Sequence, residues 1–294
     1  MPIDQRRFLA LAATTALACN FKARAAETQP ALFWRVTIGS SSAILYGYER
    51  VAASVVPDVV KDGDRFIDET KSLILDLSPV VKFPAIEIDR KITVPLSNTI
   101  SKQTLTDLRD AFGKTPQIAS MTDLLSGFEI TSLLMGEGQT PSPATAGGVI
   151  AQHGRALDRP VALLISDAEA QGLWNPPDIA ALNRSIDEDK VRYLLDLRKQ
   201  VGPIGAHLEK LYLARQSEEI NRFTADIRQH GIVSPSSFLS EERMRALLLD
   251  RLVAALAAQD AVAAFALLPL GLLTGADGLV AKLRAGGHAV TVLA

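Results

Sequence analysis

Cysteine and histidine are both scarce in this sequence, which contains one cysteine and four histidines among its 294 residues. A single cysteine cannot form a disulfide within the chain, and it excludes the zinc sites that are built from several thiolates. No histidine has a second histidine or a cysteine at the spacing that metal ligands require. We therefore expect surface or helix-capping roles for the four histidines, which are His153, His207, His230 and His288.

A strong charge of one sign and a long apolar segment are also absent. Lys and Arg total 31 and Asp and Glu total 33, with no basic run, so the electrostatic footprint of a nucleic-acid-binding protein is missing. No segment reaches the ~20 apolar residues of a membrane-spanning helix. The G-x-S-x-G motif of serine hydrolases does not occur. We expect small-molecule or protein partners, no nucleic acid, and no transmembrane span in the mature chain.

The first 25 residues have the layout of an export signal. Two arginines precede the apolar run Phe8–Ala18, and Ala23–Ala25 supplies an A-x-A cleavage site. We expect a signal peptide at 1–25 and a mature domain at 26–294 that is periplasmic or secreted. Export by the general or the twin-arginine route and lipidation at Cys19 stay open. Cleavage after the A-x-A site is favoured, and it would remove the only cysteine.

Apolar periodicity and turn residues predict alternating strands and helices. Strands are expected at Leu32–Ile38, Ala43–Tyr46, Ser72–Leu77, Pro160–Ser166 (buried), Val262–Leu268 and Ala289–Leu293, with an exposed ribbon at Ile86–Pro95. Helices are expected at Val56–Glu69, Lys102–Phe112 (capped by Ser101), Asp187–Val201, Ala206–His230, Ser240–Leu256 and Ala276–Arg284.

This order of elements favours one α/β or α+β domain, with a central mixed sheet and flanking helices. The strand, helix, strand sequence near the N-terminus predicts a parallel crossover. The Gly-, Pro- and Ser-rich segment Gly136–Gly148 is typical of a loop. A helical insert is expected at about 97–256.

Two segments near the chain ends share a pattern. Pro30–Arg50 begins P-A-L-F-W-R-V and ends G-Y-E-R, and Phe265–Leu293 contains P-L-G-L-L-T-G-A-D-G-L. Together they resemble the terminal signatures of the TraB/PrgY/GumN (TraB/GumN) family, which open with P-x-L-W-x-V and G-x-x-H and close with a second G-x-x-H before L-x-G-x-x-G-L. The resemblance implies an EreA/ChaN-like fold in which the two motifs meet across a sheet. It also implies a divalent metal that activates water, as in the Tiki-type metalloproteases.

The residues that match the family's site depart from its pattern. The first motif glycine is Gly47, but Arg50 stands at its histidine, and arginine cannot ligate a metal. In the next strand Asp76 replaces a glutamate, and Ser78 replaces an aspartate. A third-strand acidic position has become Ile165.

The second half of the pattern is altered in the same way. Of the family's Arg-Asn pair, Arg243 persists and Met244 replaces the asparagine. At the closing motif Pro269 stands at the glycine and Leu272 at the histidine, and leucine can neither ligate a metal nor transfer a proton. We hypothesise that Arg50 and Asp76 form a salt bridge where the family holds a metal, with Leu272 at the position of the third metal ligand. The alternative is an Arg50 that turns to solvent.

Three functional hypotheses follow. The first is a pseudoenzyme, without metal or cofactor, that binds or scaffolds a protein, polysaccharide or peptide in the cell envelope. The second is an active metal-dependent peptidase or hydrolase with a rearranged site. The third is a small-molecule binder with a tryptophan as a stacking wall. The rearranged site would use Asp76, Glu49, Asp277 and Arg243, and the stacking wall would be Trp34 or Trp174.

Overall fold

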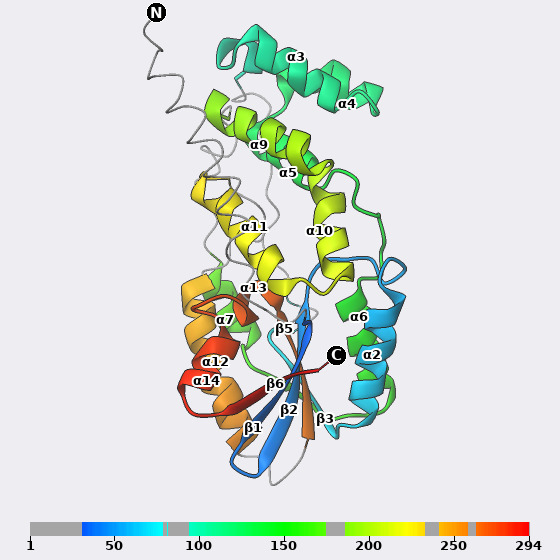
Figure 1. The fold of residues 1–294 in the computed structure, drawn as a ribbon, viewed down its shortest axis with the longest axis vertical. Helices are drawn as coiled ribbons and strands as arrows, with labels where there is room; N and C mark the ends of the chain where they lie inside the picture. Colours follow the sequence, from blue (N-terminus) through cyan, green and yellow to red (C-terminus); the bar gives the residue numbers. More distant parts are fainter. Residues whose placement is uncertain are drawn as a thin grey trace, which may run out of the picture.

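The computed structural model describes residues 31–78, 81, 94–174, 186–232, 241–257 and 263–293. Its centre is a six-stranded mixed sheet in the order β4-β3-β5-β2-β1-β6 (Figure 1). The predicted mixed α/β sheet with flanking helices is confirmed. The strand bounds are β1 Phe33–Ile38, β2 Ser41–Tyr48, β3 Ser72–Leu75, β4 Val161–Leu163, β5 Ala263–Pro269 and β6 Ala289–Leu293.

Strands β1 and β2 form the predicted hairpin. Phe33 pairs with Tyr46 and Ile38 with Ser41, which leaves a tight turn at Gly39. This glycine has a φ of +58°, a left-handed conformation that a residue without a Cβ adopts at little cost. The serine-rich segment after Gly39 therefore completes the turn of the hairpin and begins its second strand, β2.

The two terminal segments lie side by side in the sheet, as predicted. Strand β5 pairs in parallel with β2, so that Gly47 is opposite Leu268 and Tyr48 is opposite Pro269. Strand β3 pairs in parallel with the other edge of β5, and β4 with β3. The predicted crossover from β2 to β3 is therefore parallel, but a strand from the far end of the chain lies between its two strands.

Helices cover both faces of the sheet. Figure 1 places α2 and α6 on one side and α7, α12 and α14 on the other. Buried side chains from the sheet and these helices form one continuous apolar core that includes Phe33, Leu73, Ile150, Leu248 and Phe265. The helix bounds are α2 Pro57–Asp68, α6 Ala146–Ala156, α7 Asp167–Leu173, α12 Glu241–Ala257, α13 Leu270–Leu273 and α14 Leu279–Ala285.

A second apolar core lies among helices beyond the end of the sheet (Figure 1). It joins side chains such as Leu108, Ile130 and Leu194, all fully buried. The predicted insert range of 97–256 thus contributes to both cores. Elements α6, β4, α7 and α12 pack with the sheet, α10 and α11 contribute Tyr212 and Ile220 to the same core, and the second core forms from the rest together with the other ends of α10 and α11. Its elements are η1 Leu96–Asn98, α3 Lys102–Ala111, α4 Pro116–Met121, η2 Thr122–Leu124, α5 Gly127–Met135, α9 Glu188–Val201, α10 Ile204–Leu213 and α11 Ser217–Gln229.

Two sequence predictions about the elements are wrong. The segment Pro160–Ser166, predicted as a buried strand, contains the edge strand β4, where Val161 is 44% and Leu163 is 45% exposed, and only Leu164 and Ile165 after the strand are buried. The helix predicted at Ala206–His230 is two helices, α10 and α11. The break is at Arg215, which has a φ of +58° and an ion pair with Asp62 of α2.

Several predicted features lie outside the described residues. They are the export signal at 1–25, most of the ribbon at Ile86–Pro95, and the Ser240 cap. The Ser101 cap is described and confirmed, since its hydroxyl accepts the Thr104 amide at 3.2 Å. No helix in the described ranges is both long enough and apolar enough to cross a membrane.

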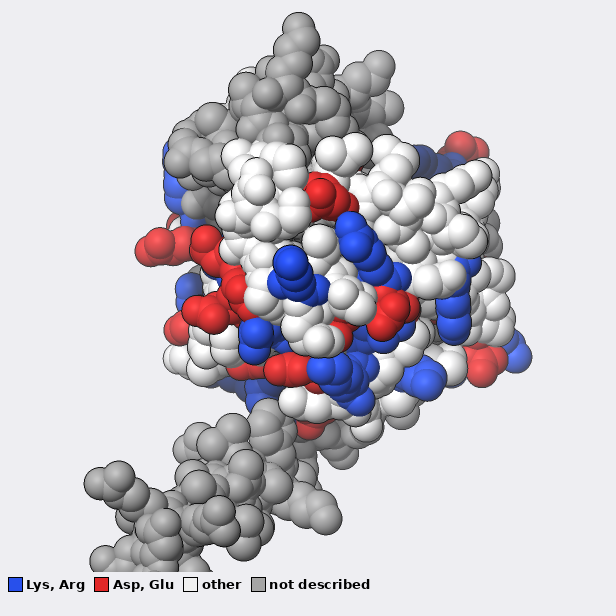
Figure 2. All heavy atoms as spheres, turned by 90° about the horizontal axis from the view of Figure 1, so that it is seen from above, with Lys and Arg blue, Asp and Glu red and all other residues white. Residues whose placement is uncertain are grey.

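The surface carries both signs of charge. On the face seen in Figure 2, acidic and basic side chains are interspersed, and neither sign forms a continuous field there. Among the described residues, exposed or partly exposed ion pairs include Arg192 with Glu188 at 2.7 Å and Arg222 with Glu219 at 2.8 Å. Exposed pairs of this kind contribute about 0–1 kcal/mol each. This face therefore has no basic stripe of the kind that binds nucleic acid.

Candidate functional site

Four parallel strands end at the same edge of the sheet, facing α10 and α11. The chain leaves β2 at Tyr48, β3 at Leu75 and β5 at Pro269. Ligands of α/β sheets bind outside the carboxyl ends of such strands. The positions that match the family's metal site, Gly47 and Asp76 among them, lie at this edge.

Asp76 is buried at this edge and is held by a tyrosine. It is 5% exposed, and its Oδ2 accepts a hydrogen bond of 2.8 Å from the Tyr48 hydroxyl. Burial raises the pKa of the carboxyl from 3.8 to about 6, although the bonds from Tyr48 and from the Leu77 and Asp76 amides favour the ionised form. Burial and the Asp76 charge raise the pKa of Tyr48 well above its usual value, so Tyr48 remains a donor.

Arg50 does not form the hypothesised salt bridge. Within the described residues no ion pair joins it to Asp76, and Arg50 is exposed. The Asp76 Oδ2 accepts the Tyr48 hydroxyl instead. The physical reason is that Tyr48 is the last residue of β2 and reaches Asp76 directly, whereas Arg50 is beyond the end of the strand.

Gly47 lies within β2, not in a tight turn, and its lack of a Cβ makes room for α13. A Cβ at Gly47 would be 2.4 Å from Leu270 Cδ1 and 3.3 Å from both Leu273 Cδ1 and Trp34 Cζ3. The glycine of the family pattern therefore serves here to let α13 pack against β2. Helix α13 starts after Pro269, which is the last residue of β5.

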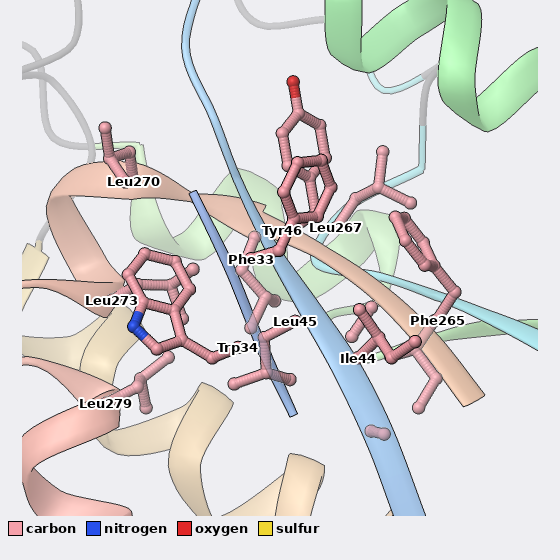
Figure 3. Packing of buried hydrophobic residues seen from close by; sticks show 14 of the residues in the cluster. Phe33, Trp34, Ile44, Leu45, Tyr46, Phe265, Leu267, Leu270, Leu273 and Leu279 are labelled. Carbon is pink, nitrogen blue, oxygen red and sulfur yellow. The ribbon is translucent and has the colours of Figure 1, made fainter. Parts of the chain in front are cut away.

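Leu272 is part of the apolar core. It is 4% exposed and belongs to the cluster that surrounds the sheet. Figure 3 shows Leu270 and Leu273 of α13 on the same side of the sheet as the Trp34 indole, with Leu279 below them. Trp34 is 4% exposed, so it is a core residue and not a stacking wall for a ligand.

Neither of the two residues on α12 at the positions of the family's Arg-Asn pair contributes a polar group to the site. Arg243 is exposed, and Met244 is 2% exposed in the core. The neighbouring Arg245 reaches the site instead, where it donates a 3.0 Å hydrogen bond to the Gly271 carbonyl of α13. Sequence analysis missed this residue, because only the position of the first arginine matched the family pattern.

A buried hydroxyl pair joins the sheet edge to the helices above it. The Tyr46 and Tyr212 hydroxyl oxygens are 2.7 Å apart, and Tyr212 donates to the Gly47 carbonyl at 3.0 Å. Both tyrosines are fully buried. Tyr212 comes from α10, so this contact fixes α10 on the end of β2. Nothing in the sequence pattern of α10 separates Tyr212 from an ordinary core aromatic.

The residues of the rearranged hydrolase site are dispersed. Asp277 is exposed in the turn between α13 and α14, and Arg243 is exposed on α12, whereas Asp76 is buried. Ile165, at the lost acidic position, is fully buried, and its amide donates to the Asp76 carbonyl at 3.0 Å. In the described part of the chain, no three His, Cys, Asp or Glu side chains are grouped so that they could hold a metal.

Of the four histidines, His153 and His230 have partners of the expected surface kind, and His207 packs against Phe223 with ring centroids 5.0 Å apart. His153 Nε2 is 3.0 Å from Asp68 Oδ1 on the surface. The His230 ring stacks on Tyr193 with centroids 3.7 Å apart, at the end of α11. These contacts position the rings at helix surfaces, away from the carboxyl edge of the sheet.

A cavity of about 70 Å³ lies beside the site, where α10 and α11 meet the end of β2. Arg50 and Glu49 line it from the sheet side, and Glu209 and Tyr212 from α10. Comparison with protein-family models, with curated proteins and with solved structures found no match for this chain. The TraB/GumN resemblance therefore still depends on the two terminal segments alone.

Proposed function

We propose that this protein is an exported TraB/GumN-like pseudoenzyme that acts in the cell envelope by binding or scaffolding a protein, polysaccharide or peptide. The observation that carries the proposal is the state of the three matched metal positions. Leu272 is in the apolar core, Arg50 is exposed, and Asp76 is hydrogen-bonded to Tyr48. An EreA/ChaN-like arrangement of the sheet and a periplasmic or secreted location are part of the proposal.

These residues do not fit a catalytic metal. A hydrolytic zinc site uses three protein ligands and keeps one position open for water. The matched positions offer one carboxylate, and that carboxylate already accepts a tyrosine hydroxyl. Leu270 and Leu273 of helix α13 also pack closely against Gly47.

The competing hypothesis is an active hydrolase, and one observation favours it. Asp76 is a buried carboxyl with a pKa of about 6, at the edge of the sheet where active sites of this fold class occur. Such a group can exchange a proton near neutral pH. This hypothesis requires Asp76 to be reached by a substrate, and it requires turnover that depends on Asp76.

A single set of measurements separates the two hypotheses. The mature chain from Ala26 would be purified, analysed for bound metal, and assayed for peptidase activity with manganese or cobalt. We expect no turnover, and no difference between the wild type and the Asp76→Asn variant. Metal-dependent turnover that is lost in Asp76→Asn but kept in Asp196→Asn, an exposed carboxylate on α9, would overturn the proposal.

The proposed location has its own test. The N-terminus of the exported protein, determined by mass spectrometry, is expected at Ala26. A lipid-modified Cys19 at the N-terminus would show a membrane-anchored form instead. Recovery of the full-length chain only from the cytoplasm would contradict export.

A further inference from the structure

The cavity beside the sheet edge has the features of a binding site for a small charged molecule. It is formed where the chain leaves β2 and meets α10, α11 and the loop that contains Gln139. Its volume is about 70 Å³. On this measure a water molecule needs about 10–15 Å³, so the cavity has room for a molecule of about five or six non-hydrogen atoms.

A buried carboxylate lines the inner part of this cavity. Glu209 is 8% exposed, and its Oε1 accepts the Thr140 amide at 2.8 Å while its Oε2 is 3.3 Å from the Thr140 hydroxyl. These bonds fix the carboxylate. Over the described ranges of the chain Glu209 has no ion pair with Lys, Arg or His. A buried carboxylate without a counter-ion is costly, and a bound cation would offset that cost.

A charge of the opposite sign lines the same cavity nearer to solvent. Arg50 is exposed, and among the described residues it forms no ion pair with Glu209. Its guanidinium suits a carboxylate, which it can bind through two parallel hydrogen bonds. Glu49 adds a second carboxylate to the lining, so the charged groups are two acids and one base.

We propose that this cavity binds a small zwitterion, with its ammonium group on Glu209 and its carboxylate on Arg50, as in glycine or alanine. The inference rests on the proposed binding function and names a ligand class for it. The size of the cavity excludes amino acids with large side chains. The difference in burial fixes the direction of the ligand, because the buried acid faces the ammonium end and the exposed base faces the carboxylate end.

The test is calorimetric titration of the purified mature protein with five probes. We expect saturable binding of glycine and alanine, and no binding of phenylalanine. Ethylamine, which lacks the carboxylate, and propionate, which lacks the ammonium group, should each bind at least roughly tenfold more weakly than alanine. Absence of binding by both small amino acids at millimolar concentration would overturn the inference.

Two variants locate the binding. Glu209→Gln keeps an acceptor for the Thr140 amide, and it should weaken alanine binding by at least roughly tenfold. Arg50→Gln should weaken alanine but leave ethylamine unchanged. Since Arg50 is exposed, this variant tests the site even if Glu209→Gln fails to fold. Alanine binding that is unaffected by Arg50→Gln would place the ligand elsewhere and overturn the inference.

Matched controls are available on the surface. Glu242→Gln on α12 and Arg109→Gln on α3 remove the same charges at exposed positions, and neither should change the affinity for alanine. The result of these titrations can be distinguished from the result of the metal and peptidase assay. A protein without turnover that binds no zwitterion refutes only this ligand class, whereas Asp76-dependent turnover refutes the pseudoenzyme proposal whatever the titrations give.

Discussion

The hydroxyl oxygens of Tyr46 and Tyr212 lie 2.7 Å apart in the core and connect the sheet to the helices above it. Tyr212 donates its proton to the Gly47 carbonyl, so Tyr46 must donate to Tyr212. The pair thereby satisfies two buried hydroxyls and one backbone carbonyl at the end of β2. It also holds α10, which carries Glu209, in place beside the candidate site.

Removal of the Tyr212 hydroxyl should destabilise the protein. Tyr212→Phe leaves the Tyr46 hydroxyl and the Gly47 carbonyl without their partner, at a cost of about 1–3 kcal/mol in the free energy of unfolding. Tyr193→Phe is the control, because its hydroxyl bonds Asp226 at the surface, and it should cost less than about 1 kcal/mol. Denaturant unfolding measures both. Equal losses in the two variants would contradict the proposed role of the buried pair.

A methyl group at Gly47 should also destabilise the fold, and for a reason that a second substitution can test. Gly47→Ala places a Cβ 2.4 Å from Leu270 Cδ1, which should cost about 1–3 kcal/mol. Shortening the neighbour in a Gly47→Ala, Leu270→Ala double variant should give less than the sum of the two single losses. The control is Gly271→Ala, where no atom lies within 4 Å of the new Cβ.

The local parts of the fold were predictable from the sequence, because short-range patterns determine them. The hairpin at Gly39 and the Ser101 cap follow from turn residues and capping chemistry, whereas the pairing of the two distant terminal segments was implied only by the TraB/GumN resemblance. The exposure of Val161 was not predictable, because strand order decides which strand is at an edge. At the helix break, Arg215 has a positive φ and pairs with Asp62, which is distant in the sequence.

The candidate site was predicted less well than the fold. Asp76 and Gly47 were identified from the family pattern, yet the role of each depends on a neighbour that the pattern does not include. Tyr48 controls the environment of Asp76, and Leu270 explains the glycine. Glu209 lies in an amphipathic helix, where a glutamate normally faces solvent. In the structure it is buried, and its carboxylate accepts the Thr140 amide from a distant loop.

The raised pKa of Asp76 makes the stability of the protein depend on pH. The carboxyl has a pKa of 3.8 when unfolded and about 6 when folded, so between these values the folded state holds the extra proton. Stability should therefore fall as the pH rises through this window, by an amount on the order of 3 kcal/mol. Asp76→Asn removes the titration and keeps an acceptor for Tyr48.

Unfolding of the wild type and of Asp76→Asn at pH 4.5 and at pH 7.5 checks this prediction. The variant should gain stability relative to the wild type at the higher pH. The exposed Asp277→Asn should show no such change between the two conditions. If the stability of the wild type and that of Asp76→Asn change by the same amount between pH 4.5 and pH 7.5, Asp76 does not cause the pH dependence.

Introduction of the two histidines of the TraB/GumN pattern tests whether the matched positions can form a metal site. Arg50→His changes an exposed residue and should alter stability by less than about 0.5 kcal/mol. Leu272→His puts an imidazole into an apolar core and should cost about 2–5 kcal/mol. A ligand that binds only the folded state raises its melting temperature, so zinc is a direct probe of whether the two histidines meet.

We expect zinc to leave the melting temperature of the double variant unchanged, because the Asp76 carboxylate is bonded to Tyr48 and Leu272 packs within the core. The single variants serve as controls for adventitious zinc binding at each histidine. Stabilisation by zinc in the double variant, but in neither single variant, would mean that the two positions can converge on one metal. In that case two substitutions would be enough to form a metal site at these positions.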